Sequence, residues 1–266
     1  MKELLKSRAL LKRRFLNKED IFAAWTSLYH PSITEIFCKA SFDFIGIDIE
    51  HSTINQEQSQ RIIAAAQAMG RLCLPRIPTH DMEIVKRLLD SGADGLIVPM
   101  ISSREQIDEI SSWMKYPPEG SRSYGVARAH GYGFDFEEYT QQWNKVCILI
   151  AQIETIDAVD NIEKIVSSPN VDGIMIGPYD LSGSLGIPGQ LNHSKVIDAC
   201  RYVLDICLQK KVSCGTQIVV PDSKSIDNAF NQGFNFVVLA SDIFILWKWS
   251  EAMDDLIHKR KRERGV

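Results

Sequence analysis

Short apolar runs alternate with longer amphipathic segments from about Asp20 to the end of the chain. A run of four to eight apolar residues bounded by turn residues indicates a buried strand, and apolar positions spaced by 3.6 residues indicate a helix. Eight runs predict strands: Ile21–Thr26, Phe42–Ile49, Arg71–Arg76, Gly95–Met100, Cys147–Ile153, Val171–Gly177, Val212–Ile218 and Phe234–Ala240.

The amphipathic segments have the length of crossover helices, and in one of them Ile84, Leu88 and Leu89 share a face. Strand and helix repeat without a linker rich in Pro, Gly or Ser, which predicts an α/β fold: one (β/α)8 TIM barrel over residues 1–266. An open, doubly wound sheet is the second option. The predicted helices are Asn55–Met69, Met82–Ser91, Arg104–Met114, Ala158–Ser167, Lys195–Lys210 and Ser223–Gln232.

Two segments depart from this alternation. Tyr116–Phe134 is rich in Gly, Pro and Arg and predicts a long loop, a feature that is usually functional or disordered inside a compact domain. Asp242–Arg264 begins more apolar than an outer barrel helix requires. It either packs tightly on its own barrel or docks on a neighbouring subunit.

The charge balance argues against nucleic acid as a partner. The net charge is −4 and the pI is about 5.9, whereas phosphate binding needs clustered Lys and Arg. Two basic runs, Lys12–Arg14 and Lys259–Arg264, are interpreted as solvated helix ends rather than as a binding patch. Small molecules are therefore the expected partners.

Compartment signals point to the cytoplasm. The amino-terminal residues are too charged for a signal peptide, and no apolar stretch approaches ~18 residues, so no membrane partner is expected. The cysteines form no CxxC pair and most lie in apolar runs, which argues against a disulfide framework. They are Cys38, Cys73, Cys147, Cys200, Cys207 and Cys214.

The carboxyl ends of barrel strands carry the chemistry of this fold, and here they are polar. Asp48, Glu50 and His51 follow the second apolar run, although an ordinary polar loop start would look similar. Arg76 lies between two prolines, which suits a guanidinium held toward a carboxylate. A structural salt bridge explains Arg76 equally well.

Glu154 and Asp180 end the fifth and sixth runs, so they are expected at the tops of adjacent strands within reach of one cation. Two carboxylates with open positions favour Mg²⁺ or Mn²⁺, with Co²⁺ as a further option. Zinc would require more nitrogen or sulfur ligands. A glycosidase acid–base pair is less favoured, because no sugar-stacking aromatic accompanies the two acids.

Lysine is absent from all eight predicted strand ends. A Schiff-base enzyme on a barrel needs such a lysine. Covalent imine chemistry is therefore disfavoured, and a metal ion would have to polarise any carbonyl.

These strand ends resemble the HpcH/HpaI family of pyruvate-dependent class II aldolases. The most specific match is QIET at Gln152–Thr155 followed by GPxDLS at Gly177–Ser182, and the similarity spans about Trp25 to Asp242. The resemblance implies a (β/α)8 barrel whose last helix is exchanged between subunits, in a hexamer built as a trimer of dimers. The other matching segments are Phe42–His51, Arg76, Leu89–Ala93, Val98–Met100, Tyr116–Arg122, Val171–Gly173 and Leu185–Gly186.

The resemblance also assigns roles. Glu154 and Asp180 correspond to the metal ligands, and Arg76 to the residue that grips the pyruvyl oxygens. His51 corresponds to the catalytic base region, held by Asp48 and Asp90. The remaining implied substrate-binding residues are Gln152, Trp25, Arg122, Gly177 and Pro178.

Three positions depart from the family pattern. Ser123 follows the loop arginine where Gly is common, and Ala23 replaces a Gly before Trp25. Tyr179 is bulkier than the small residue expected between Pro178 and Asp180, and is expected to narrow the pocket. These changes bear on the aldehyde-binding surface rather than on the metal ligands.

The implied function is a divalent-metal-dependent class II aldolase, an aldehyde-lyase. It would form or cleave 4-hydroxy-2-oxo acids from pyruvate and an aldehyde through a metal-stabilised pyruvate enolate. One alternative is a citrate lyase β-like or malyl-CoA lyase activity. Another is a catalytically silent barrel that binds an acidic metabolite.

Overall fold

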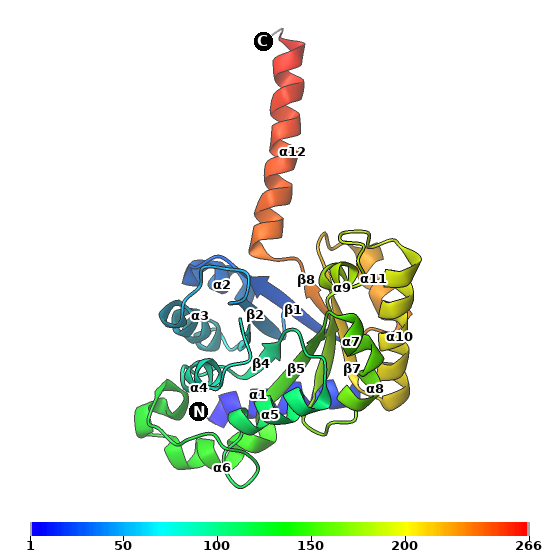
Figure 1. Ribbon diagram of the computed structural model, residues 1–266. Helices are drawn as coiled ribbons and strands as arrows, with labels where there is room; N and C mark the ends of the chain where they lie inside the picture. The colour runs from blue at the N-terminus through cyan, green and yellow to red at the C-terminus, as the bar shows by residue number, and fades with distance from the viewer. Residues whose placement is uncertain (1, 265–266) are drawn as a thin grey trace.

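The computed structural model describes residues 2–264 and forms a closed barrel of eight parallel strands in the order β1 to β8 (Figure 1). All eight predicted strands are present, and the closed barrel excludes the open sheet. Several apolar runs extend one or two residues beyond the hydrogen-bonded ladder. The strands are β1 Ile21–Thr26, β2 Phe44–Asp48, β3 Leu72–Arg76, β4 Gly95–Val98, β5 Ile148–Ile153, β6 Gly173–Ile176, β7 Ser213–Ile218 and β8 Phe236–Leu239.

Five of the six predicted helices form as single elements. Side-chain caps define several of their starts, such as Ser103, whose hydroxyl accepts from the Gln106 amide. The sixth segment, Ala158–Ser167, is divided into two short helices that meet at Asn161, whose side chain donates to the Ser102 carbonyl instead. The predicted helices are α3 Gln56–Ala68, α4 Met82–Asp90, α5 Arg104–Met114, α7 Ile156–Asp160, α8 Ile162–Ile165, α10 Ser194–Lys210 and α11 Ser223–Gln232.

Four further α-helices were not predicted: α1 Lys2–Asn17, α2 Pro31–Cys38, α6 Phe136–Val146 and α9 Pro178–Ser184. Most of them are short, or are so polar that their buried stripe is narrow. The predicted loop Tyr116–Phe134 contains a 3-10 helix, η1 Arg128–Gly133, and is otherwise irregular.

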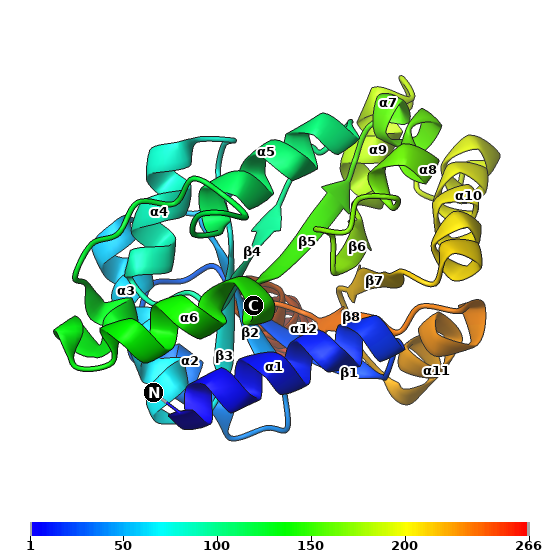
Figure 2. The same ribbon diagram turned by 90° about the horizontal axis from the view of Figure 1, so that it is seen from below.

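Helix α1 lies across the amino-terminal end of the barrel, as Figure 2 shows from below. Its Phe15 is fully buried and packs against Phe236 at 5.4 Å between ring centroids. Lys12 binds Asp172 at 2.7 Å, and Arg14 pairs with Asp43. The interpretation of the first basic run as a solvated helix end is therefore wrong, because two of its three side chains form partly buried ion pairs.

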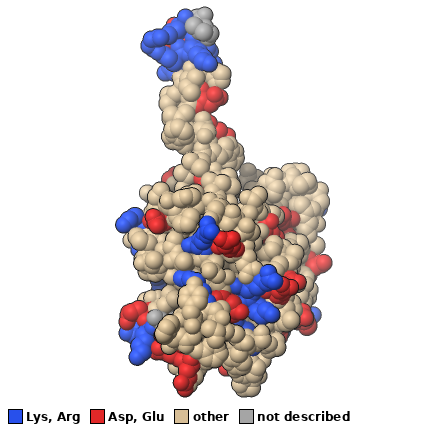
Figure 3. Space-filling model, turned by 90° about the vertical axis from the view of Figure 1, so that its left-hand side faces the viewer, with Lys and Arg blue, Asp and Glu red and all other residues tan. Residues whose placement is uncertain are grey.

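Helix α12, Asp242–Glu263, projects away from the barrel (Figure 1). Only Asp242 in this helix is buried; it accepts hydrogen bonds from the Ser27 and Leu28 amides and the Thr26 hydroxyl. The alternative in which this segment packs tightly on its own barrel is therefore excluded for this chain. The second basic run forms an exposed cluster at the far end of α12 (Figure 3).

The cysteine prediction is confirmed, since all six cysteines are free and five are buried. Across residues 2–264, none of the helices combines the length and the apolar character needed to span a bilayer.

Candidate active site

The β2–β3 register places Asp48 beside Arg76 at the carboxyl end of the barrel. Arg76 Nη2 and Nε donate to Asp48 Oδ1 at 2.8 and 3.2 Å. Arg76 Nε also lies 3.2 Å from Glu50 Oε2, although the two do not form a hydrogen bond. One edge of the guanidinium is thus occupied by Asp48, and Nη1 has no hydrogen-bond partner within residues 2–264.

The Trp25 ring packs against the guanidinium of Arg76. The guanidinium carbon lies 5.0 Å from the ring centroid, a cation–π distance. Gly46 pairs with Trp25 in the β1–β2 register, and a Cβ there would lie 2.4 Å from the indole ring. Glycine at this position leaves the space that the ring fills, so Trp25 lies next to Arg76.

Glu154, at the end of β5, is almost fully buried. Its Oε2 accepts from the Met100 amide at 2.9 Å and its Oε1 from Gln152 Nε2 at 2.6 Å. Burial raises the pKa of Glu154 to about 7, and the nearby Glu50 and Asp180 carboxylates add to this effect. The same site thus holds more negative charge than Arg76 compensates.

Asp180 lies in the first turn of α9, directly after β6. Gly177 precedes this helix, and a Cβ there would lie 2.7 Å from the Glu154 side chain, so the glycine lets the two strand ends approach. Asp180 also raises the pKa of Glu50, after the larger effect of burial. Glu50, Glu154 and Asp180 therefore share one electrostatic environment.

This donor set fits a divalent cation. Gln152 Oε1 is buried without a partner, and Glu154 ionises unfavourably in the absence of a counter-charge. In residues 2–264 no three His, Cys, Asp or Glu side chains gather closely enough to enclose an ion. The residues therefore suit an open site in which two carboxylates hold the ion and substrate completes its coordination.

His51 lies beside this cluster but is largely exposed. Its ring Nε2 is 3.7 Å from Glu50 Oε2, while its backbone amide donates to Asp48 Oδ1 at 3.0 Å. Asp48 therefore fixes the backbone of His51, and Glu50 is the acid paired with its ring. The family resemblance implied only that Asp48 and Asp90 hold His51.

Asp90 and Arg122 are not in this group. Asp90 ends α4 and accepts from Arg122 Nη2 at 2.8 Å. The Arg122 side chain is fully buried among Tyr116, Tyr139 and Trp143, 4.7 to 5.6 Å from their ring centroids. In the single chain, the expected contacts of Asp90 with His51 and of Arg122 with the site do not form, because α4 carries Asp90 toward the opposite end of the barrel.

Tyr179 is 65% exposed and faces the loop after α9, where a Cβ on Gly189 would lie 3.5 Å from its hydroxyl oxygen. Among the departures from the family pattern, Ala23 is fully buried in β1 and Ser123 is exposed. Tyr179 therefore extends along α9 and its loop instead of filling the space between Glu154 and Arg76.

Two contributors were missed in the sequence. Met100 adopts a left-handed backbone with φ 53°, and its amide contacts Glu154. Such a conformation is uncommon outside glycine and often marks functional sites. Glu50 was noted but given no role. Its position two residues after Asp48, just beyond the end of β2, was the available signal.

The comparisons with known proteins identify the family of this chain. The family model for HpcH/HpaI aldolase/citrate lyase matches residues 22–248. The chain belongs to the HpcH/HpaI aldolase/citrate lyase family.

Within this family, the chain is 31% identical to the hydroxypyruvate/pyruvate aldolase of Roseobacter denitrificans, covering 88% of this chain and 91% of that protein. It is 29% identical to the 5-keto-4-deoxy-D-glucarate aldolase of Escherichia coli O6:H1, covering 91% and 94%.

Among solved structures, an HpcH/HpaI aldolase/citrate lyase family protein from Burkholderia cenocepacia superposes with a TM-score of 0.87 at 27% identity, covering 94% of this chain and 99% of that one. The citrate synthase SbnG gives 0.82 at 26% identity, covering 95% and 98%. The HpcH/HpaI fold thus serves more than one carbon–carbon bond chemistry.

Proposed function

We propose that this protein is a divalent-metal-dependent aldolase that joins pyruvate to an aldehyde and reverses that reaction. The observation that supports this most directly is the buried Glu154 carboxyl, which shares its environment with Glu50 and Asp180 beside a single guanidinium. Such an excess of buried negative charge is stabilised by a bound cation. The aldolase relatives agree with this assignment.

Glu154 and Asp180 would hold the divalent ion, which would be Mg²⁺ or Mn²⁺. When bound, the cation would stabilise the negative charge that develops on the keto oxygen of pyruvate as its methyl group loses a proton, by roughly several kcal/mol. The Met100 amide and Gln152 keep the Glu154 carboxylate in place. Gln152, with its free Oε1, lies where it would line the pyruvate site.

Arg76 would bind the pyruvyl oxygens through Nη1, the nitrogen that Asp48 leaves available. Asp48 and the Trp25 ring prevent the guanidinium from moving, so the substrate meets a donor that is already oriented. A lysine would lack this planar geometry.

His51 would move a proton to or from the hydroxyl that forms on the aldehyde carbon. Its exposed ring is accessible from the mouth of the barrel, and Glu50 lies near enough to orient it. Cleavage of the product follows the same steps in reverse.

The test is turnover of pyruvate with a panel of aldehydes in the presence of Mg²⁺ or Mn²⁺. Glu154→Gln and Asp180→Asn each remove one negative ligand with little change of shape, and we expect metal-dependent turnover to fall by at least about a hundredfold. The exposed Glu57→Gln variant on α3 serves as the matched control.

Two outcomes would contradict the proposal: full activity of either variant, or full wild-type activity in a strong chelator. An additional arm, with acetyl-CoA and either oxaloacetate or glyoxylate in place of pyruvate and the aldehyde, examines the citrate and malyl-CoA alternatives. Turnover confined to that arm would replace the aldolase assignment.

We also propose that the protein is a homo-oligomer in which α12 of one subunit packs on the barrel of another. Leu246, Trp249, Leu256 and Ile257 are all about half exposed or more and lie at helical spacing along α12. The family resemblance extends this expectation to a hexamer built as a trimer of dimers.

A further inference from the structure

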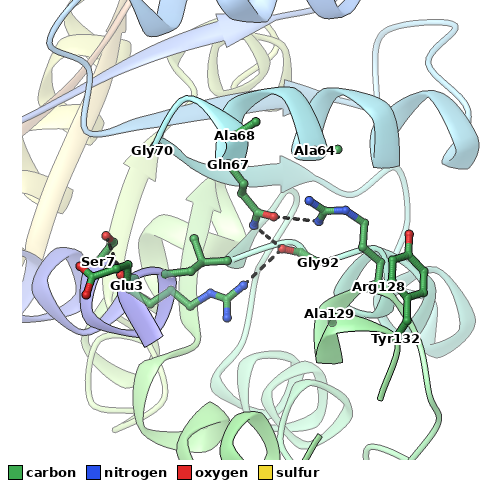
Figure 4. Close-up of a pocket in the computed structure, with 12 residues that line it drawn as sticks. Glu3, Ser7, Ala64, Gln67, Ala68, Gly70, Gly92, Arg128, Ala129 and Tyr132 are labelled. Carbon is green, nitrogen blue, oxygen red and sulfur yellow. Dashed lines mark hydrogen bonds between the residues drawn. The ribbon is translucent and has the colours of Figure 1, made fainter. Parts of the chain in front are cut away.

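A second cavity, of about 480 Å³, lies at the other end of the barrel (Figure 4). Its walls come from α1, from the carboxyl-terminal end of α3, from the turn after α4 and from η1. The volume falls within the range of small-molecule sites. None of its lining residues belongs to the candidate active site: Glu3, Leu4, Ser7, Arg8, Ala64, Gln67, Ala68, Gly70, Gly92, Arg128, Ala129 and Tyr132.

Gln67 organises the polar wall of this cavity, as Figure 4 shows. Its Nε2 donates to the Gly92 carbonyl at 2.8 Å and to Asp94 at 3.0 Å, and its Oε1 accepts from Arg128 Nη1 at 2.7 Å. Gly92 has φ 103°, and a Cβ there would lie 2.3 Å from Arg128 Nη1. Arg128 is therefore held in a defined position that requires glycine beneath it.

The two arginines of the cavity differ in their charge compensation. Arg8 is fully buried, and its Nε donates to the equally buried Asp94 at 2.6 Å. Arg128 donates only to neutral acceptors, Gln67 Oε1 and the Ser91 carbonyl. Burial lowers the pKa of Arg128, whereas Tyr132 and the Asp94 charge raise it. Within residues 2–264, Arg128 is therefore the arginine of this cavity that has no carboxylate as a hydrogen-bond partner.

Arg128 also keeps donors free. Within residues 2–264 its hydrogen bonds all come from Nη1, so Nε and Nη2 remain available along one edge of the guanidinium. That edge presents two parallel N–H groups, the geometry that binds a carboxylate or a phosphate with two hydrogen bonds. Glu3 is the acid on the cavity wall, and it is paired with Lys6 at 2.8 Å.

We propose that this cavity binds a small molecule through a carboxylate or phosphate group, which the Nε–Nη2 edge of Arg128 would grip. The Tyr132 side chain, 67% exposed on the same wall, would contact the rest of the ligand. The site is separate from the catalytic end, so its ligand need not be a substrate of the aldolase reaction.

The experiment is isothermal titration calorimetry of the full-length protein with inorganic phosphate in one arm and succinate in the other. We expect at least one anion to bind the wild type and Arg128→Gln to weaken that binding by about tenfold or more. Arg87→Gln, at an exposed arginine on α4 paired with Glu83, should leave it unchanged. The arm that binds more tightly identifies a phosphate or a carboxylate ligand.

Two further variants make the result decisive. Glu3→Gln removes a negative charge from the cavity wall and should strengthen binding, whereas Arg76→Lys should not alter it. Thermal unfolding of Arg128→Gln verifies that the variant is folded. Absence of binding in both arms, binding unaffected by Arg128→Gln, or binding lost in Arg76→Lys would each overturn the proposal.

Discussion

At the scale of single residues, the candidate active site is a balance between several acids and one guanidinium. Asp48 compensates Arg76 directly, with hydrogen bonds of 2.8 and 3.2 Å. Glu154 has no such cation, and its carboxyl is almost fully buried. Burial raises its pKa most, and the Glu50 and Asp180 carboxylates add to this effect, so a positive ligand would favour the ionised form.

The metal-free protein should accordingly lose stability as the pH rises from about 5 to about 8. The pKa of Glu154 is about 7 in the folded protein, above its ordinary value of 4.5, so the folded state holds a proton that the unfolded chain has released. The resulting loss is at most about 3 kcal/mol. It is measured as the free energy of unfolding in urea, with a chelator present.

Glu154→Gln cannot ionise and should show a smaller decline with pH than the wild type, while Glu57→Gln should follow the wild type. Glu50 also has a raised pKa and is present in all three proteins, so the difference reports on Glu154 together with its interaction with Glu50. Parallel curves for Glu154→Gln and the wild type would contradict this explanation.

At the scale of elements, α1 closes the amino-terminal end of the barrel. Phe15 inserts between Phe236 and Phe44, with ring centroids 5.4 and 6.3 Å away, and a Cβ on Gly173 would lie 3.3 Å from its ring. Lys12 adds a hydrogen bond to the Cys147 carbonyl at 2.7 Å. The barrel interior is thus closed by a helix that precedes the first strand.

Phe15→Ala should lower the free energy of unfolding by about 3–5 kcal/mol, because it leaves a cavity among buried aromatic rings. Chemical denaturation followed by circular dichroism measures this change. Leu16→Ala is the matched control, since Leu16 is 62% exposed and should cost little. A loss below about 1 kcal/mol for Phe15→Ala would show that α1 is not needed to close the barrel.

At the scale of the whole molecule, α12 is the helix whose apolar residues are not buried by the rest of the single chain within residues 2–264. It is anchored at Asp242 and then extends from the carboxyl-terminal end of the barrel with its apolar residues exposed (Figure 1). Exposed apolar area of this kind is unusual on a monomer and is typical of a subunit interface. We therefore expect a second copy of the chain to cover the exposed apolar residues of α12.

Leu246→Glu combined with Trp249→Glu should reduce the oligomer to a monomer, because both charges would have to be buried in the interface. Light scattering after size-exclusion chromatography measures the mass. The exposed Asp255→Ala variant on the same helix should keep the wild-type mass. A wild-type protein that is monomeric at micromolar concentration, or a double variant with unchanged mass, would contradict the proposed assembly.

Local sequence patterns are enough to predict the order of strands and helices and most of the residues at the strand ends. Apolar runs and amphipathic segments fix which parts of this chain must be buried, and that requirement is local. The eight strands, the polar tops with Asp48, Arg76 and Glu154, and the family all follow from such local patterns. The helix α1 was missed because it is polar overall and its buried stripe is narrow: Leu5, Arg8, Leu11 and Phe15.

The three-dimensional fold is needed to tell which polar side chains lie together. It pairs Asp90 with Arg122 in an aromatic cluster, gives the His51 ring to Glu50, and turns the Met100 amide toward Glu154. It also leaves α12 off its own barrel. The physical reason is that contacts between residues far apart in sequence depend on helix directions, backbone conformations and chain closure, which no local periodicity encodes.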